Sequence, residues 1–574
     1  MFEKLARKLG LETNPAIFFV SASLTVLFVV CAITFTDQVD LVFGATSEWI
    51  LSHLGWLYIL GVTTFLIFLI WIASSRFGNI RLGPPDSRPD YSNLTWFCML
   101  FAAGIGSILM FWGVAEPISH YANPPQGNAE PETIEAAQQA MGFTLYHFGL
   151  HTWTIFCLPA LAFAYFVYRK GLPFRVSSIF HPFLGDRVNG PFGRIIDIFA
   201  VLGTLFGVAV TIGLGTMQIN SGLNTLFGVE ESRVNQLILI AVVTCVAVIS
   251  VASGLDVGIK WLSQINIIIA VALLVFVFAA GSSLYLAKGV IETTGVYAQW
   301  LIPLSFWNDT FGNTGWQGTW TVFYWAWTIT WSPFVGIFIA RISRGRTIRE
   351  FVLGVLGLPT AFSIVWFSVF GLSAFDIEMN RGGGLVEEVV GQGDIPGALF
   401  AFLTHYPWTT FVSAMCIVIV IIFFTTSSDS ASLVVDMLCS GTEESPTRQR
   451  VFWGITEGVV AATVLTASGV GGLDALQQTI IVFGLPFFVI GFFMMFSLVR
   501  ALQAETAESS GVQRGRRTPL SARSRRLRRQ HRRSRGPSPG GNGGNGGRGN
   551  GNGNGNGNGN GNGNGKRGDD ALEP

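Results

Sequence analysis

Residues 320–334 read WTVFYWAWTITWSPF and lie within an apolar segment, residues 318–340, that contains no charged side chain. A segment of about 20 apolar residues can cross the hydrocarbon core of a bilayer as a helix. Pro333 weakens that helix, because proline has no amide proton for the helical hydrogen bond. This stretch therefore predicts a membrane-spanning helix that is interrupted within the membrane and rich in aromatic side chains.

Apolar segments of similar length recur along the whole chain. Of its 574 residues, 50% are hydrophobic and 12% are charged, whereas about 25% are charged in an ordinary soluble domain. This composition excludes a soluble protein of this size, because so few charged residues would not cover its surface. We predict an all-α polytopic membrane protein with twelve transmembrane helices, near residues 16–36, 54–73, 95–115, 142–168, 195–219, 236–253, 261–286, 318–340, 351–373, 408–428, 452–468 and 475–499.

Basic residues are divided unequally between the segments that connect the predicted spans. Eighteen lie in one alternating set of these segments, and three lie in the other set, namely Arg233, Lys288 and Arg381. Positively charged segments stay on the cytoplasmic side of a membrane. The imbalance therefore predicts that both termini are cytoplasmic and that the number of spans is even.

Two of the predicted spans contain residues that weaken a helix. The third span contains Gly104 and Gly106 near its middle, and the eighth contains Pro333. Interruptions at corresponding positions of two halves indicate the substrate site of a transporter. The two spans lie five apart, so spans three to seven and eight to twelve would form two inverted repeats. Close helix packing explains the glycines equally well when they are taken alone.

Aromatic side chains gather on two of these spans. Trp327 and Trp331 are four residues apart and therefore share a helix face. Phe148, Trp153 and Phe156 lie within about two turns of the fourth span. Aromatic faces bind quaternary ammonium groups, although such stripes more often serve as core or lipid contacts. Their position on a proline-containing helix favours a binding function.

Consecutive hydroxyl side chains, at Thr426, Ser427 and Ser428, follow Phe423 near the end of the tenth span. They can bind a hard cation through oxygen, although bonding back to helix carbonyls is the usual behaviour of such residues. A proton-coupled carrier needs a titratable group at depth. Acidic residues are few in the spans and lie near their ends, which favours coupling to an ion held by hydroxyls and carbonyls; they are Glu116, Asp197, Asp429, Asp436 and Glu457.

An enzyme and an ion channel are the alternatives from other classes. His147 and His151 are four residues apart, the spacing of two metal ligands on one helix face. However, no glutamate follows His147 in an H-E-x-x-H pattern, and the aromatic neighbours indicate packing. We therefore predict no catalytic residue.

Several motifs resemble the betaine/choline/carnitine transporter family, over about residues 15–500. The resemblance implies a leucine-transporter-like inverted-repeat fold preceded by two extra helices. It also implies a homotrimer in the plasma membrane that carries out secondary transport of trimethylammonium solutes. The motifs are AAGIG (102–106), MFWGVAEP (110–117), YFVYRKGLP (165–173), YWAW (324–327), WSPFVG (331–336), ARISRGR (340–346) and TSSDS (426–430).

The same resemblance implies how the chain is divided. On this layout a cytoplasmic N-terminal segment and two transmembrane helices precede two repeats, and a cytoplasmic tail follows them. The corresponding residues are 1–15, 16–94, 95–317, 318–500 and 501–574.

The resemblance also implies a substrate site in which Trp327 and Trp331 cage the ammonium group. It implies a sodium site formed by the hydroxyls of Thr426 and Ser427, with carbonyls of Ala102, Ile105 and Phe423. Thr204 and Phe334 match part of a second sodium site. The full set of predicted substrate-binding residues is Trp327, Trp331, Phe148, Trp153, Phe156, Gly104, Gly106, Trp325 and Thr328.

Three positions depart from the family pattern. Ile108 stands where betaine carriers have a third glycine, Thr328 replaces a tryptophan, and Val208 replaces a threonine of the second sodium site. The resulting expectation is sodium-coupled uptake of glycine betaine or a close relative for osmoprotection, with sodium as coupling ion and no other cofactor. The alternatives are proton-coupled choline transport and sodium-independent exchange of carnitine and betaine.

The C-terminal tail has a different composition. Eleven arginines lie between residues 514 and 535, and Gly-Asn repeats dominate residues 536–568. Such a segment buries no apolar area and is expected to be disordered. Its arginines are expected to attract anionic lipids, a function that the family resemblance links to osmotic activation; a general cytoplasmic anchor explains them equally well. No folded nucleic-acid-binding module accompanies them, so no nucleic-acid partner is predicted.

Overall fold

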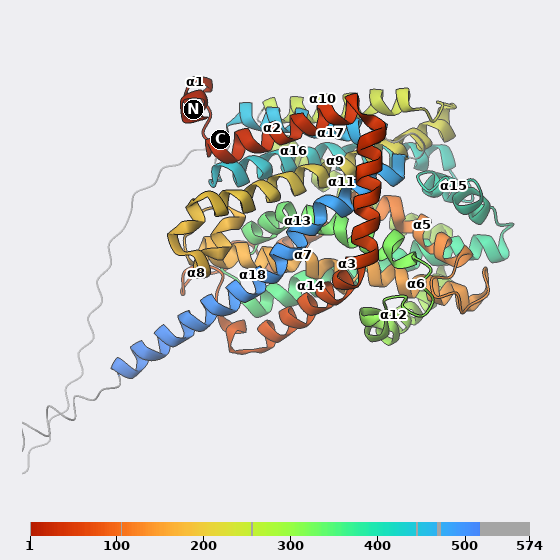
Figure 1. Ribbon diagram of the computed structural model, residues 1–574. Coiled ribbons are helices and arrows are strands. Elements are labelled where there is room, and N and C mark those ends of the chain that lie inside the picture. The colour runs from red at the N-terminus through yellow and green to blue at the C-terminus, as the bar shows by residue number, and fades with distance from the viewer. Residues whose placement is uncertain (1, 105, 254–255, 444–445, 468–471, 517–574) are drawn as a thin grey trace, which may run out of the picture. The chain divides into compact units, whose positions relative to one another are not determined.

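Helices make up almost all of the described part of the chain (Figure 1). The computed structural model describes residues 2–104, 106–253, 256–443, 446–467 and 472–516. The chain divides into two units, residues 1–506 and residues 507–574. Within the described ranges no β-strand occurs, and an isolated bridge joins Arg81 to Thr347. The predicted all-α class is confirmed.

The helices follow one another with short connections. They are α1 (Phe2–Leu9), α2 (Pro15–Thr34), α3 (Thr36–Ser74), η1 (Arg76–Asn79), α4 (Asn93–Gly104), α5 (Gly106–Ala122), α6 (Ile134–Phe148), α7 (Leu150–Phe163), η2 (Ala164–Arg169), η3 (Val176–Phe180), α8 (His181–Leu184), η4 (Gly185–Asn189), α9 (Pro191–Phe227), α10 (Arg233–Ser253), α11 (Asp256–Ala280), α12 (Ser283–Phe306), η5 (Gly318–Val322), α13 (Phe323–Ile342), α14 (Ile348–Asn380), η6 (Glu387–Gly391), α15 (Ala398–Leu403), α16 (Thr409–Ser440), α17 (Thr447–Ala467) and α18 (Gly472–Arg516).

Nine helical segments of the described chain are long and apolar enough to cross a membrane. A tenth candidate is the pair formed by α11 and α12, which is bent by 114° at its break. The chain is therefore a multi-pass membrane protein. The count of twelve spans and the arrangement in repeats stay predictions.

The α3 and α12 helices differ from the sequence-based expectation. The α3 helix begins at Thr36 and has 39 residues, because the acidic residues that suggested a connecting segment are compatible with a helix. The α12 helix was not predicted, since Lys288 and Glu292 lower its hydropathy. Its buried residues nevertheless recur every three or four positions, as in an amphipathic helix that packs on one face; they include Leu286, Gly289, Thr293, Tyr297 and Leu304.

The expected interruption at Pro333 is not present, and this part of the prediction was wrong. The α13 helix runs from Phe323 to Ile342 through Pro333. Proline at this position leaves the carbonyl of Ile329 without its usual amide donor. The hydroxyl of Ser332 donates to that carbonyl over 2.7 Å. The backbone is thus satisfied locally, and the irregular turn lies instead at η5.

The centre of the bundle is formed by helices whose residues are buried on all sides. Nearly all residues of α6, α7 and α13 are buried, whereas most residues of α2 and α10 are exposed. The α13 helix packs against both α7 and α9. Gly336 allows the close approach to α7, because a Cβ atom there would lie 3.2 Å from the backbone nitrogen of Ala160. The predicted aromatic residues therefore lie in the protein interior.

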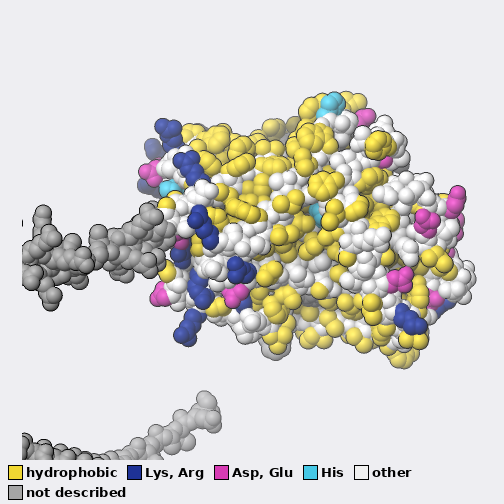
Figure 2. Space-filling model, turned by 90° about the horizontal axis from the view of Figure 1, so that it is seen from below, with side chains coloured by type: hydrophobic (Ala, Val, Ile, Leu, Met, Phe, Trp, Pro, Cys, Tyr) yellow, Lys and Arg dark blue, Asp and Glu magenta, His cyan; other side chains and the backbone are white. Residues whose placement is uncertain are grey.

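Charged side chains gather at the two ends of the first unit. On the face that Figure 2 shows, lysine and arginine side chains collect at one end and most acidic side chains at the other, with a hydrophobic band between. This is the distribution that a positively charged cytoplasmic side produces. It supports the predicted cytoplasmic termini, which stay a prediction.

We predict that Gly215→Ala destabilises the bundle at the contact between α9 and α16. A Cβ atom at Gly215 would lie 1.7 Å from the ring of Phe424, so the ring must move. Overpacking of this kind costs about 1–3 kcal/mol. Thermal unfolding of the purified protein in detergent should therefore show a lower midpoint.

Gly295→Ala on α12 is the matched control, because nothing lies within 4 Å of a Cβ atom there. Its midpoint should be unchanged or slightly raised, since alanine favours a helix over glycine. Equal midpoints for the two variants would contradict the close contact at Gly215.

Candidate substrate and ion sites

Trp327 and Trp331 lie on the side of α13 that faces α9. The indole nitrogen of Trp327 donates to Thr211 Oγ1 over 3.0 Å. A Cβ atom at Gly207 would lie 3.0 Å from Trp331 Cδ1, so this glycine leaves room for the second ring. Both tryptophans are buried, with exposed fractions of 2% and 5%. The structure thus brings the two rings to one interior face.

On α7, Trp153 and Phe156 form a second aromatic pair. Their ring centroids are 5.6 Å apart, and both rings are buried. Because α7 packs directly against α13, the two aromatic pairs belong to neighbouring helices of the core. Phe148 lies apart at the end of α6, stacked on Phe367 of α14 at 4.5 Å.

Two other predicted substrate residues have neighbours of their own. Trp325 stacks on His151 with ring centroids 5.7 Å apart. It is two residues from Trp327 and so points to a different side of α13. The hydroxyl of Thr328 donates to the carbonyl of Tyr324 over 2.7 Å, which occupies its hydrogen within the helix.

The predicted sodium site lies on α16. The hydroxyl of Thr426 donates to the carbonyls of Ile422 and Phe423, at 2.8 and 3.1 Å. Its oxygen lone pairs remain available to a cation, and Ser427 beside it is partly buried. Of the proposed partners, Ile105 lies outside the described residues. The neighbouring positions Ala102, Gly104 and Gly106 are helical, and their side chains also lie outside the described part.

Thr204 and Phe334, the predicted part of a second sodium site, are both buried on α9 and α13. Thr204 Oγ1 has no hydrogen-bond partner within the described chain. An unsatisfied buried hydroxyl is costly, and a bound cation would satisfy it. Val208, one turn further along α9, is buried and supplies no ligand atom.

Glu457 is a buried acid that sequence reasoning placed at the end of a span. It lies about 15 Å along α17 from Thr447, the first residue of that helix. Ser428 Oγ donates to Glu457 Oε2 over 2.7 Å, and Glu457 Oε1 has no partner among the described residues. The nearby Arg450 pairs with Asp429 at 3.0 Å. The expectation that all acidic residues lie near span ends was therefore wrong for Glu457.

A cavity of about 780 Å³ opens between α3, residues 308–319 and the start of α18. None of the predicted substrate or sodium residues lines it. Its acidic lining residues are Glu48, Asp309 and Asp474.

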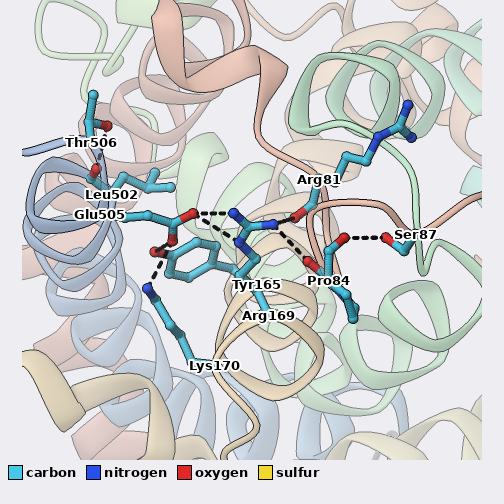
Figure 3. Close-up of polar contacts among 10 residues, drawn as sticks. Arg81, Pro84, Ser87, Tyr165, Arg169, Lys170, Leu502, Glu505 and Thr506 are labelled. Carbon is cyan, nitrogen blue, oxygen red and sulfur yellow. Dashed lines mark hydrogen bonds and ion pairs between the residues drawn. The ribbon is translucent and has the colours of Figure 1, made fainter. Parts of the chain in front are cut away.

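An ion-pair network ties α18 to two earlier segments (Figure 3). Arg169 pairs with Glu505, and its guanidinium also donates to the carbonyls of Arg81 and Gly83. Lys170 Nζ lies 2.8 Å from Glu505 Oε2, and the hydroxyl of Tyr165 donates to the same oxygen over 2.8 Å. One carboxylate thus holds η2, the segment after η1 and α18 together.

Comparison with known proteins adds the following findings. The sequence model described as "BCCT, betaine/carnitine/choline family transporter" matches residues 16–507. The chain is 47% identical to an ectoine/glycine betaine/proline transporter of Corynebacterium glutamicum, over 88% of this chain and 83% of that protein. It is 43% identical to a glycine betaine transporter of Acinetobacter baylyi, over 89% and 77%. It is 40% identical to a high-affinity choline transport protein of Escherichia coli, over 86% and 73%.

We predict that Glu505→Gln weakens the network around Arg169. The substitution keeps the shape of the side chain but removes the charge that accepts from Arg169, Lys170 and Tyr165. Hydrogen bonds to charged groups contribute about 1.5–3 kcal/mol. The midpoint of thermal unfolding should fall accordingly.

Glu443→Gln is the control for this experiment. Glu443 is exposed and accepts one longer hydrogen bond, 3.3 Å from Tyr168. Its replacement should leave the midpoint within error of the unaltered protein. An equal drop for both variants would show that Glu505 is not a special contact.

Proposed function

Because the chain belongs to the betaine/carnitine/choline transporter family, we propose that it takes up glycine betaine or a related trimethylammonium solute by sodium-coupled symport with alternating access. Osmoprotection is the proposed physiological purpose. The observation that carries the proposal is the buried pair Trp327 and Trp331 on one face of α13. The pair offers aromatic faces in a site that excludes water.

The chemistry of the solute explains why such a pair is suitable. A trimethylammonium group carries a positive charge but no hydrogen-bond donor, so ring faces are its natural partners. In a desolvated site a cation over an aromatic face is stabilised by about 2 kcal/mol or more. Glycine betaine and choline, which the names of two relatives contain, share this group. Trp153 and Phe156 on the adjacent α7 are the proposed second side of the cage.

The proposal for sodium rests on oxygen ligands. Thr426 and Ser427 supply two hydroxyls, and Thr204 supplies a buried hydroxyl without a partner among the described residues. Sodium is a hard cation and prefers such oxygens to nitrogen or sulfur. Val208 removes one expected ligand of the second site, so we propose one sodium ion at Thr426 as the minimum.

Proton coupling is the second candidate, and Glu457 is the observation that favours it. A membrane-buried carboxylate that is bonded to a single serine is costly when charged. It therefore tends to carry a proton or to hold a cation. Sodium-independent exchange of solutes is the third candidate of the same class.

The assembly and surroundings complete the proposal. We propose a homotrimer in the plasma membrane with both termini in the cytoplasm. The arginines of residues 514–535 would contact anionic lipids there.

We predict that Trp327→Ala and Trp331→Ala each weaken uptake of labelled glycine betaine. Loss of one aromatic face should cost about 2 kcal/mol, or roughly a 30-fold rise in the half-saturating concentration. Uptake is measured in proteoliposomes with an inward sodium gradient. Trp49→Ala is the control, because Trp49 is 53% exposed on α3. Normal uptake by both interior variants would refute the cage.

We predict that a sodium gradient drives uptake and that a pH gradient alone does not. The two gradients are imposed separately on proteoliposomes that contain the unaltered protein or one variant. Thr426→Ala should raise the sodium concentration needed for half-maximal uptake. Glu457→Gln, which mimics a protonated carboxyl, should leave the sodium requirement in place. Uptake driven by pH alone and abolished in Glu457→Gln would establish the proton as coupling ion.

A further inference from the structure

Three buried titratable side chains meet between α5 and α6. Glu116 and His120 lie one turn apart on α5, and His147 lies near the end of α6. His147 Nδ1 is 2.7 Å from Glu116 Oε1, and His120 Nε2 is 3.3 Å from the same oxygen. One ligand atom from each residue lies within 4.8 Å of the other two. All three residues have no exposed surface.

The polar atoms of this cluster are incompletely satisfied. Both ring nitrogens of His120 and the oxygen Oε2 of Glu116 lack a hydrogen-bond partner in the described chain. The surrounding groups are aromatic: the ring of His120 lies 4.5 Å from that of Trp320, and the ring of His147 stacks on Trp316 at 5.8 Å. Unsatisfied polar atoms in such surroundings are costly, and a bound cation would satisfy them.

We propose that Glu116, His120 and His147 bind a divalent transition-metal ion, with Zn²⁺ as the representative ion. Two imidazole nitrogens and one carboxylate oxygen are a donor set that Zn²⁺ takes, with bonds of about 2.0–2.2 Å. Tetrahedral bonds of this length place ligand atoms about 3.3–3.5 Å apart. The separation of His120 from Glu116 already has this value, and the separation of His147 from Glu116 must lengthen by several tenths of an ångström.

A further contact orients His147 for this function. Its second nitrogen, Nε2, lies 2.9 Å from Thr321 Oγ1 of η5. Metal-binding histidines are usually held by such a hydrogen bond on the nitrogen that does not bind the metal. Thr321 is fully buried, so the bond does not compete with bulk water. The site therefore has three first ligands and one supporting residue, drawn from three helical elements.

The nature of the ligands distinguishes this site from the proposed sodium sites. Sodium and other hard cations select oxygen, whereas imidazole nitrogens select zinc, copper, iron or nickel. The cluster also lies at the start of the path that leads through η5 into α13, the helix of Trp327 and Trp331. A metal ion would brace α5 and α6 against η5. We therefore expect bound zinc to slow transport, an expectation that rests on the proposed function, whereas zinc binding does not.

The binding experiment uses the full-length protein, purified in detergent and stripped with a chelator. Zinc chloride is titrated, and bound zinc per chain is measured together with the midpoint of thermal unfolding. We expect one high-affinity zinc ion per chain and a midpoint that rises with zinc. His120→Leu should lose the high-affinity zinc. The variant is expected to fold, because leucine fills the same space and removes two unpaired nitrogens.

Two further variants make the result specific. Thr321→Val keeps all three ligands and should weaken zinc binding by about 10- to 100-fold, as loss of a supporting residue does. His53→Gln removes an exposed histidine of α3 and should bind zinc like the unaltered protein. Equal zinc affinity in His120→Leu and the unaltered protein would overturn the proposal. So would an unfolding midpoint that responds to pH through His120 but not to zinc, because the cluster would then hold a proton.

The transport measurement separates this proposal from the proposed function. Micromolar zinc should inhibit uptake by the unaltered protein and by His53→Gln, but not by His120→Leu. If zinc binds as described and the protein transports no trimethylammonium solute, the metal site stands and the proposed function fails. If uptake is normal but no zinc binds, the metal site fails and the proposed function stands.

Discussion

The constraint on which the rest of the structure depends is that hydrocarbon offers the backbone no hydrogen-bond partner. Every amide and carbonyl in the membrane must therefore be satisfied by the chain itself, and helices are the general solution. Pro333 shows how strictly this holds. Where its ring removes one donor, the hydroxyl of Ser332 bonds the carbonyl of Ile329, and α13 continues without a break. This continuity keeps Trp327 and Trp331 on one face.

The same constraint gives buried polar side chains a particular meaning. In a water-soluble core, a stray polar group costs free energy but can reach the surface when the side chain is long. Within a membrane bundle it must find an internal partner, as Glu457 does in Ser428 and Asp429 does in Arg450. Groups that remain unpaired in the described chain, such as Thr204 Oγ1, are therefore candidates for ligand or ion binding.

Composition and segment length predicted the helical class and the multi-pass arrangement, because both follow from the thickness of the bilayer. They did not predict which side of a helix faces which neighbour. In α7 and α13 all faces are apolar, so the periodicity that reveals a buried face in soluble proteins is absent. The separation of Trp325 from Trp327, and of Phe148 from Trp153, required the packing itself. The α12 helix escaped for the opposite reason, since it is amphipathic and too polar for a hydropathy threshold.

The placement of Glu457 also bears on how an ion would be coupled. Ser428, the residue to which it bonds, follows the proposed sodium ligands Thr426 and Ser427 directly on α16. If sodium binds at Thr426, a proton on Glu457 and the sodium ion act on the same helix turn. Thermodynamic linkage then requires that each changes the affinity of the other by the same factor. A pH effect on transport would not by itself identify the proton as the transported ion. A sodium affinity that shifts with pH in the unaltered protein, and stays constant in a variant without the carboxylate, would assign Glu457 to the tuning of the sodium site.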